Sequence, residues 1–258
     1  MTGTGRPVAL VTGASSGIGA ELARELAHGG HDLVLTARRE APMQKLAREM
    51  ERIGAAAAVI PADLSRPGAA EALAGTVEAQ GLAIDVLVNN AGLGAAGRFD
   101  RSDPVRIAEM LNVNIVALTE LTRLLLPGMV ARRRGRILLV ASTAAFLPGP
   151  GMAVYFASKA YVLSLGEALA QELRGSGVTV TTLCPGATAT EFFKVAGSAE
   201  GRRGMMSAAA VAQLGWRGLM AGRRVVVAGI ANKAQALAAR FGPHTVSLPV
   251  AAALMARR

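Results

Sequence analysis

The stretch VTGASSGIGAELARELA, residues 11–27, joins an apolar run to an amphipathic segment through three glycines, Gly13, Gly17 and Gly19. Glycine adopts positive φ and lets the backbone approach a ligand closely, so a tight turn is expected here. A helix that follows would present free N–H groups and partial positive charge to a phosphate. The order of strand, glycine turn and helix therefore predicts an α/β unit with a phosphate site at its turn, although the glycine spacing differs from the commoner G-x-G-x-x-G.

Further apolar runs follow this one, and helix-like stretches such as 19–30 and 111–130 lie between them. Alternating strands and helices predict parallel pairing with right-handed crossovers, and continuous apolar strands fit a sheet that is covered on both faces. Because no Pro/Gly/Ser-rich linker interrupts the series, we expect residues 1–258 to form a single-domain Rossmann fold, a doubly wound and mostly parallel seven-stranded sheet. The strand candidates are 7–13, 32–38, 57–64, 84–92, 135–142, 178–186 and 223–229.

The composition favours a soluble protein, which we expect to be cytoplasmic. The 258 residues are 52% hydrophobic, enough for a large buried core. The longest uncharged stretch, 137–158, is broken by prolines and glycines, and the N-terminal MTGTGRPVALVTG lacks the basic start of a secretory signal. The single cysteine, Cys184, excludes a disulfide within the chain and is expected to be a buried small hydrophobe, and no metal site is predicted.

The formal net charge of +10 raises the possibility of a nucleic-acid partner. The arginines are scattered, however, and aromatic residues make up only 3% of the chain, too few for a base-stacking platform. The densest basic run, RRRGR at 132–136, follows a long apolar-periodic segment and fits a solvated helix end. We therefore expect no nucleic-acid partner and favour phosphates or acidic substrates as the target of this charge.

Polar side chains follow two later strands of the expected sheet. Asp63 ends the third strand and can accept a hydrogen bond from an adenine amino group, and NNAG at 89–92 ends the fourth. Each is also an ordinary turn former by itself. Ligands of open α/β sheets bind at the carboxyl ends of the strands, so the joint occurrence favours a nucleotide site there.

A tyrosine and a lysine stand four residues apart in VYFASKAYVLSLGEALAQEL, residues 154–173. On a helix Tyr155 and Lys159 share a face, which also fits a plain surface pair. A tyrosine with a pKa of about 10 is a poor acid–base catalyst at neutral pH, and a nearby cation favours its phenolate. Tyr161, the other tyrosine, lies on a different face and is expected to pack or to form an interface.

Taken together, these motifs resemble the short-chain dehydrogenase/reductase family over about Pro7 to Gly229. TGASSGIG at 12–19 matches the TGxxxGxG of that family, and NNAG at 89–92 matches its NNAG. The order and spacing of its Asn–Ser–Tyr–Lys tetrad are found in Asn114, Ser142, Tyr155 and Lys159. The stretch from Pro185 to Thr190 resembles the segment that holds the nicotinamide carboxamide.

The resemblance implies an oxidoreductase that transfers hydride between a nicotinamide and a carbonyl or secondary alcohol. Tyr155 would exchange the proton, Ser142 would bind the substrate oxygen, Lys159 would hold the ribose, and Asn114 would anchor a water leading from Lys159 to solvent. The expected cofactor-binding residues are Gly13, Ser15, Ser16, Gly17, Ile18, Gly19, Arg38, Arg39, Asp63, Leu64, Asn90, Ala91, Gly92, Tyr155, Lys159, Pro185, Gly186, Thr188 and Thr190.

The end of the second strand, LTARRE at 35–40, predicts the choice of cofactor. An enzyme that prefers NAD usually has an acidic residue here to bind the ribose 2′-hydroxyl, whereas this chain has Ala37. Guanidinium groups match phosphate oxygens with paired donors. We therefore expect NADP(H) to be preferred over NAD(H), with Arg38 as the main 2′-phosphate contact and Arg39 in support. Glu40 is able to reach the ribose or to pair with either arginine.

Two later segments are expected to serve the substrate and the assembly. Residues 187–215 resemble a substrate lid, in which Phe192, Phe193, Met205 and Met206 suggest a partly apolar substrate and Arg202 and Arg203 an anionic group, unless they pack on the body. The tail, 231–258, is predicted to form one or two basic amphipathic helices, interrupted at Gly242-Pro243. Packing on the body or on a partner subunit is favoured over attachment to a membrane surface.

The segments 104–130 and 155–174 resemble the pairing helices of the family, which implies a homodimer or homotetramer. Two other classes of function are open: a nucleotide-binding regulatory protein without turnover, and a membrane-surface protein that acts through the tail. The intact tetrad weakens the first, and the absence of a longer hydrophobic anchor weakens the second.

Overall fold

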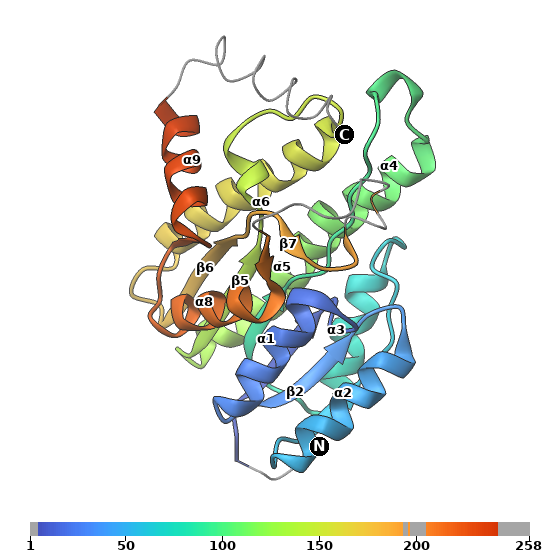
Figure 1. Cartoon of the computed structure of the whole chain (residues 1–258). Helices are drawn as coiled ribbons and strands as arrows, with labels where there is room; N and C mark the ends of the chain where they lie inside the picture. Colours follow the sequence, from blue (N-terminus) through green and yellow to red (C-terminus); the bar gives the residue numbers. More distant parts are fainter. Residues whose placement is uncertain (1–4, 193–195, 197–204, 242–258) are drawn as a thin grey trace.

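A parallel seven-stranded sheet forms the centre of the computed structural model, which describes residues 5–192, 196 and 205–241 (Figure 1). Its strand order is β3-β2-β1-β4-β5-β6-β9, and every neighbouring pair is parallel. Each strand lies within a predicted apolar run, so the predicted fold is confirmed. The strands are β1 Val8–Thr12, β2 Asp32–Thr36, β3 Ala57–Val59, β4 Ile84–Asn89, β5 Gly135–Val140, β6 Val178–Cys184 and β9 Val225–Val227.

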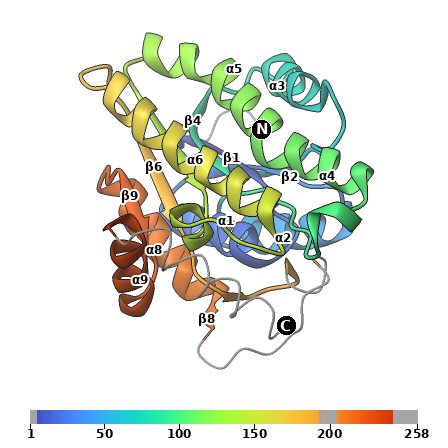
Figure 2. The same cartoon turned by 90° about the horizontal axis from the view of Figure 1, so that it is seen from above.

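Helices cover both faces of this sheet (Figure 2). On one face lie α1 Gly17–His28, α2 Glu40–Arg52 and α8 Ala208–Met220, and on the other α3 Ala69–Ala79, α5 Leu118–Ala131 and α6 Ala153–Glu172. Successive strand side chains alternate between the two cores: in β1, Ala9 and Val11 join the first and Leu10 joins the second. The apolar runs are continuous because both faces are buried.

Helix α5 continues a shorter helix, α4 Pro104–Leu111, through a π-helical turn, η2 Asn112–Ala117. A π turn inserts one residue into the helical repeat and often lies at a functional site. Residues Pro104–Ala131 are long and apolar enough to cross a membrane by length and composition alone, a test that core helices of soluble proteins also pass. In this structure α5 contacts α3, β4 and β5, so it is part of the packed fold.

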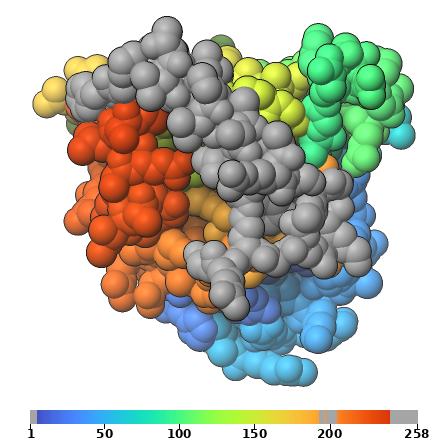
Figure 3. Space-filling model, turned by 45° about the horizontal axis from the view of Figure 1, so that its top comes forward, coloured from blue at the N-terminus to red at the C-terminus, as the bar shows by residue number. Residues whose placement is uncertain are grey.

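The C-terminal part of the described chain adds small elements above the sheet. A two-residue strand, β7 Thr188–Ala189, pairs with β8 Met206–Ser207, and a short helix, η3 Thr143–Phe146, follows β5. Helix α9, Ile230–Phe241, contacts η3 and β9, so the described part of the tail lies on the body. In Figure 3 the red α9 and the green segment leading into α4 rise on opposite sides of the molecule.

Two details differ from the sequence prediction, and other predicted segments lie outside the part of the chain that the structure describes. Asp63 lies in a loop beyond β3, which ends at Val59. The last part of the predicted lid, 208–215, is the start of α8, and Val211 and Ala212 are buried there because this helix packs on the sheet. Phe193, Arg202, Arg203 and residues 242–258, to which a lid or tail role was assigned, lie outside the described residues.

Candidate active site

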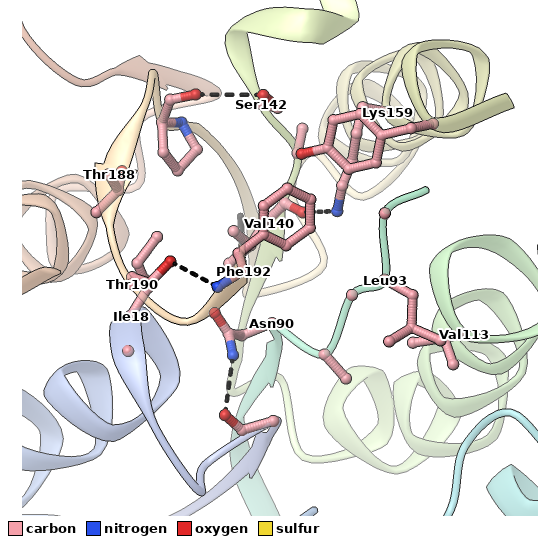
Figure 4. A pocket seen from close by; sticks show the side chains of 18 of the residues that line it. Ile18, Asn90, Leu93, Val113, Val140, Ser142, Lys159, Thr188, Thr190 and Phe192 are labelled. Carbon is pink, nitrogen blue, oxygen red and sulfur yellow. Dashed lines mark hydrogen bonds between the residues drawn. The ribbon is translucent and has the colours of Figure 1, made fainter. Parts of the chain in front are cut away.

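A pocket of about 930 Å³ opens at the carboxyl ends of the strands (Figure 4). Its size is within the range of small-molecule and cofactor sites. The structure brings together nearly all the catalytic and cofactor-binding residues predicted from the sequence, and only Gly19 and Asn114 do not line the pocket. Both of these lie directly behind its wall.

The glycine turn after β1 is held by close backbone contacts. Gly13 and Gly17 have φ of +67° and +58°, which favours glycine, and a Cβ at Gly13 would lie 2.8 Å from Asn90 Nδ2. A Cβ at Gly19 would collide with the carbonyl oxygen of Gly13, so the first turn of α1 and the end of β1 approach as closely as backbone allows. Asn90 Nδ2 also donates to the Thr12 carbonyl oxygen at 3.0 Å, which ties this turn to the end of β4.

The N-terminus of α1 faces the pocket beside this turn. Ser16 is the N-cap residue, and its side chain makes no capping hydrogen bond. The first-turn N–H groups and the helix dipole therefore form an anion site, and no acidic side chain stands in the first turn. The glycine cradle and this helix end fit the pyrophosphate of a dinucleotide cofactor.

Two arginines and an aspartate stand at the side of the pocket next to β2 and β3. Arg39 Nη2 lies 3.0 Å from Ser16 Oγ and 2.6 Å from Glu191 Oε2, while Arg38 lines the pocket nearby. Asp63 Oδ1 accepts hydrogen bonds from the backbone N–H and the hydroxyl of Ser65, at 3.1 and 2.7 Å. Burial favours the neutral form of Asp63, but these hydrogen bonds and the charges of Arg38 and Arg66 together outweigh it and hold the pKa of the carboxyl below its usual value.

Tyr155, Lys159 and Ser142 meet at the other side of the pocket. Lys159 is only 4% exposed, and its Nζ donates to the Val140 carbonyl oxygen at 2.9 Å (Figure 4). The same nitrogen lies 5.9 Å from the centre of the Tyr155 ring. Ser142 Oγ donates to the Pro185 carbonyl oxygen at 3.4 Å and accepts from the N–H of Ala144 at 3.1 Å.

Burial shifts the pKa values of Tyr155 and Lys159 in opposite directions. It raises the pKa of Tyr155 to about 12, against the effect of a hydrogen bond with Ser142. It lowers the pKa of Lys159 to about 8, against the effect of nearby Cys184. Tyr155 therefore holds its proton at neutral pH and is able to donate it, while a charged Lys159 next to it would stabilise the anion that remains.

Asn114 supports the wall of the pocket from the π-helical turn. Its Oδ1 accepts from the N–H of Leu93 at 2.8 Å, and its Nδ2 donates to the Leu93 carbonyl oxygen and to Ser158 Oγ, both at 2.9 Å. Gly92 separates it from the cluster, since a Cβ there would lie 3.3 Å from Lys159 Nζ and 3.5 Å from Asn114 Oδ1. The side-chain amide of Asn114 thus positions the 92–93 backbone beside Lys159.

Several pocket residues were not found from the sequence. Apolar side chains surround Tyr155, and they include the predicted Phe192, whose ring centre lies 5.3 Å from that of the tyrosine. Asn232 and Gln235 reach the pocket from α9, which no local motif indicates, although their spacing of three residues places them on one helix face. The other residues missed include Glu191, Leu147, Met152 and Phe156.

The remaining candidates have other positions. Phe192 lines the pocket as predicted, but Met205 and Met206 do not: β8 pairs with β7, which directs Met206 onto the core. Cys184 is fully buried, and burial raises the pKa of its thiol to about 12. Tyr161 is exposed and forms a hydrogen bond with Thr119 at 3.0 Å. Within the described part of the chain, no cluster of acidic, histidine or cysteine side chains is suited to a metal.

Comparison with known proteins identifies related chains. The short chain dehydrogenase family matches residues 7–201. The ketoacyl reductase HetN of Nostoc sp. is 38% identical over 185 residues, 71% of this chain and 63% of that protein, so the match spans less than two thirds of that relative.

The matches to solved structures cover a larger share of both chains. A short-chain dehydrogenase from Sphingobium yanoikuyae in complex with NADPH has a TM-score of 0.83 and 34% identity, over 90% of this chain and 92% of that one. A short chain dehydrogenase/reductase from Burkholderia phymatum in complex with NAD has a TM-score of 0.81 and 28% identity, over 92% and 94%.

The buried lysine predicts a pH-dependent stability. Because its pKa falls from 10.5 to about 8 on folding, the folded state bears the full cost of the buried charge below pH 8 and none above pH 10.5. Lys159→Met should raise the free energy of unfolding at pH 7 by up to about 3 kcal/mol, because each pKa unit corresponds to about 1.4 kcal/mol. This gain should shrink as the pH rises from 8 to 10.5, measured by urea denaturation at each pH. Lys45→Met, at an exposed site on α2, is the matched control, and a pH-independent difference between the variants would contradict the prediction.

Proposed function

Because the chain belongs to the short-chain dehydrogenase/reductase family, we propose that it is an NADP(H)-dependent oxidoreductase acting on a carbonyl or secondary alcohol. The observation that carries the proposal is the meeting of Tyr155, Ser142 and Lys159 in the same pocket as the glycine turn and the N-terminus of α1. The pocket holds a phosphate-binding end and a proton-donating end, as the reduction of a carbonyl by a dinucleotide requires.

The proposed chemistry follows from the protonation of the cluster. When bound, NADPH supplies the hydride that the carbonyl carbon accepts. Tyr155 donates its hydroxyl proton to the carbonyl oxygen, and the Ser142 hydroxyl binds that oxygen as negative charge develops on it. Charged Lys159 then stabilises the tyrosinate. In the direction of alcohol oxidation, the tyrosinate takes the hydroxyl proton back.

The lining near Tyr155 favours a partly apolar substrate. Leu147, Met152, Phe156 and Phe192 supply apolar walls, and burial of the matching part of a substrate contributes roughly 25 cal/mol per Å². Asn232 supplies an amide on the same side, where a Cβ at Gly186 would collide with it, so this amide lies against the Pro185–Gly186 turn. These residues suit a ketone that has an apolar part next to the carbonyl and a polar group farther away, which the Asn232 amide would bind.

Copies of the chain are proposed to associate through the outer face of α4, α5 and α6, which lie side by side (Figure 2). Large apolar side chains are exposed there, among them Val105 and Val116, and Tyr161 joins α6 to α5 through Thr119. Light scattering at micromolar concentration should report a dimer or tetramer, and Val116→Glu should lower the mass because it charges this face. Ile53→Glu is the matched control at an equally exposed apolar site on another surface. A monomeric unmodified protein would contradict the proposal.

The role of Tyr155 can be tested by removing its hydroxyl alone. Tyr155→Phe should lower kcat for carbonyl reduction by about a hundredfold or more, the scale of a positioned proton donor. Binding of NADPH, followed by its fluorescence, should change little. Tyr161→Phe removes the same group from the outer face of the same helix and should retain turnover. Full activity of the Tyr155→Phe variant would exclude this residue from the mechanism.

The cofactor preference can be tested at Arg38. Ala37 places no carboxylate at the end of β2, and Arg38 lines the pocket, so kcat/KM should be higher with NADPH than with NADH. Arg38→Asp should abolish or reverse this ratio because a carboxylate then faces the 2′-phosphate. Arg48→Asp, on α2 and away from the pocket, controls for the change in net charge. Equal kcat/KM with both cofactors in the unmodified protein would overturn the assignment.

A further inference from the structure

Arg39 is bound from two sides of the pocket at once. Its Nη2 lies 2.6 Å from Glu191 Oε2, and the same nitrogen lies 3.0 Å from Ser16 Oγ and 3.4 Å from Ser15 Oγ. The two serines belong to the glycine turn, whereas Glu191 follows β7 in the segment that leads away from the sheet. The ion pair therefore links the two segments that border the phosphate-binding part of the pocket.

The residues on either side of Glu191 also touch the pocket walls. A Cβ at Gly17 would lie 3.0 Å from Thr190 Cγ2, so the chain before Glu191 rests on the glycine turn. Phe192, directly after Glu191, lies 5.3 Å from Tyr155 between ring centres and fills the space over Gly94. In Figure 4, Thr190 and Phe192 lie between Ile18 and Asn90 on one side and Lys159 on the other. The Thr190–Phe192 segment thus spans the pocket from its phosphate end to its catalytic end.

In this arrangement the Glu191 carboxylate occupies the Arg39 guanidinium that a cofactor phosphate would bind. A carboxylate and a phosphate are both anionic oxygen acceptors that a guanidinium binds through paired donors. The side chains of Arg39 and Glu191 are 52% and 56% exposed, and such exposed pairs contribute only about 0–1 kcal/mol. The doubly charged 2′-phosphate is therefore able to replace the carboxylate, whereas a 2′-hydroxyl lacks the charge to do so.

We propose that Glu191 is a specificity-determining residue that competes with the 2′-phosphate of NADP(H) for Arg39, and that this exchange releases the Thr190–Phe192 segment from the glycine turn. The proposal rests on the proposed NADP(H) function and adds to it a step at which the cofactor acts on the catalytic end of the pocket. A cofactor without the phosphate leaves the ion pair in place, and with it Phe192 against Tyr155.

The competition can be measured without turnover, using adenosine fragments that lack the nicotinamide. Isothermal titration at low salt should show that Glu191→Gln binds 2′,5′-ADP about two- to fivefold more tightly than the unmodified protein, the range expected for loss of an exposed ion pair. Binding of 5′-AMP should not change. Glu40→Gln is the matched control, because it removes the same charge from the residue next to Arg39, whose carboxylate contacts Gln44 instead.

A double-mutant cycle separates competition from simple charge repulsion. In an Arg39→Gln background, Glu191→Gln should have no effect on 2′,5′-ADP binding if the two groups compete for Arg39. An equal gain in both backgrounds would overturn the competition. If the unmodified protein binds 2′,5′-ADP and 5′-AMP equally, the NADP(H) assignment itself fails. If it prefers 2′,5′-ADP and Glu191→Gln changes nothing, only the competition fails.

Hydrogen exchange tests the release of the segment. Backbone amides of residues 188–192 should exchange up to about fivefold faster with saturating 2′,5′-ADP than with 5′-AMP, the range that an exposed ion pair allows. Those of Glu191→Gln should exchange faster than those of the unmodified protein by a similar factor when neither nucleotide is present. Most ligands slow hydrogen exchange at their binding site. Faster hydrogen exchange would therefore be specific to the replacement of Glu191 by the 2′-phosphate as the partner of Arg39. Unchanged or slower exchange with 2′,5′-ADP would overturn the release.

Discussion

The hydrogen bond from Lys159 Nζ to the Val140 carbonyl oxygen fixes the catalytic end of the pocket, where Tyr155 and Ser142 also lie. A buried ammonium is costly without an acceptor, and Val140 offers one at the last position of β5, where the parallel sheet ends. Helix α6 comes close enough to the sheet because Gly166 has no side chain: a Cβ there would collide with Thr182 of β6. Tyr155, one turn before Lys159, is consequently held at the same edge as Ser142, which follows β5.

At the phosphate-binding end of the pocket, different interactions hold the residues in place. The glycine turn is fixed by backbone contacts that allow no Cβ, and its neighbours Asn90 and Thr12 are tied by hydrogen bonds. Around this rigid cradle stand exposed charges, among them Arg39 and Glu191, whose positions depend on weak, screened attractions. The rigid glycine turn therefore serves the pyrophosphate that NAD(H) and NADP(H) share. The choice between these two cofactors depends on the exposed charges beside it.

The sequence predicted those parts of the molecule that are determined by residues close together in the chain. Continuous apolar runs located all seven sheet strands, and the glycine turn and the Tyr155–Lys159 spacing located the pocket that they share. The rest depends on tertiary contacts. The π-helical turn presents Asn114 to Leu93, the β7–β8 pairing turns Met206 to the core, and packing of α9 on η3 brings Asn232 into the pocket. Asn114 itself was found from its place in the tetrad, but none of these three contacts has a periodicity or motif that could be read along the chain.

The buried thiol of Cys184 makes this chain a convenient host for chemical probes. Cysteine reagents attack an accessible thiolate, and the one cysteine of the sequence is inside the sheet with its pKa raised to about 12. A second cysteine introduced at any surface position would therefore be the preferred target of a maleimide label, with no need to delete the native one. A single fluorophore or spin label can therefore be attached near the pocket while Cys184 and the packing of β6 are left unchanged.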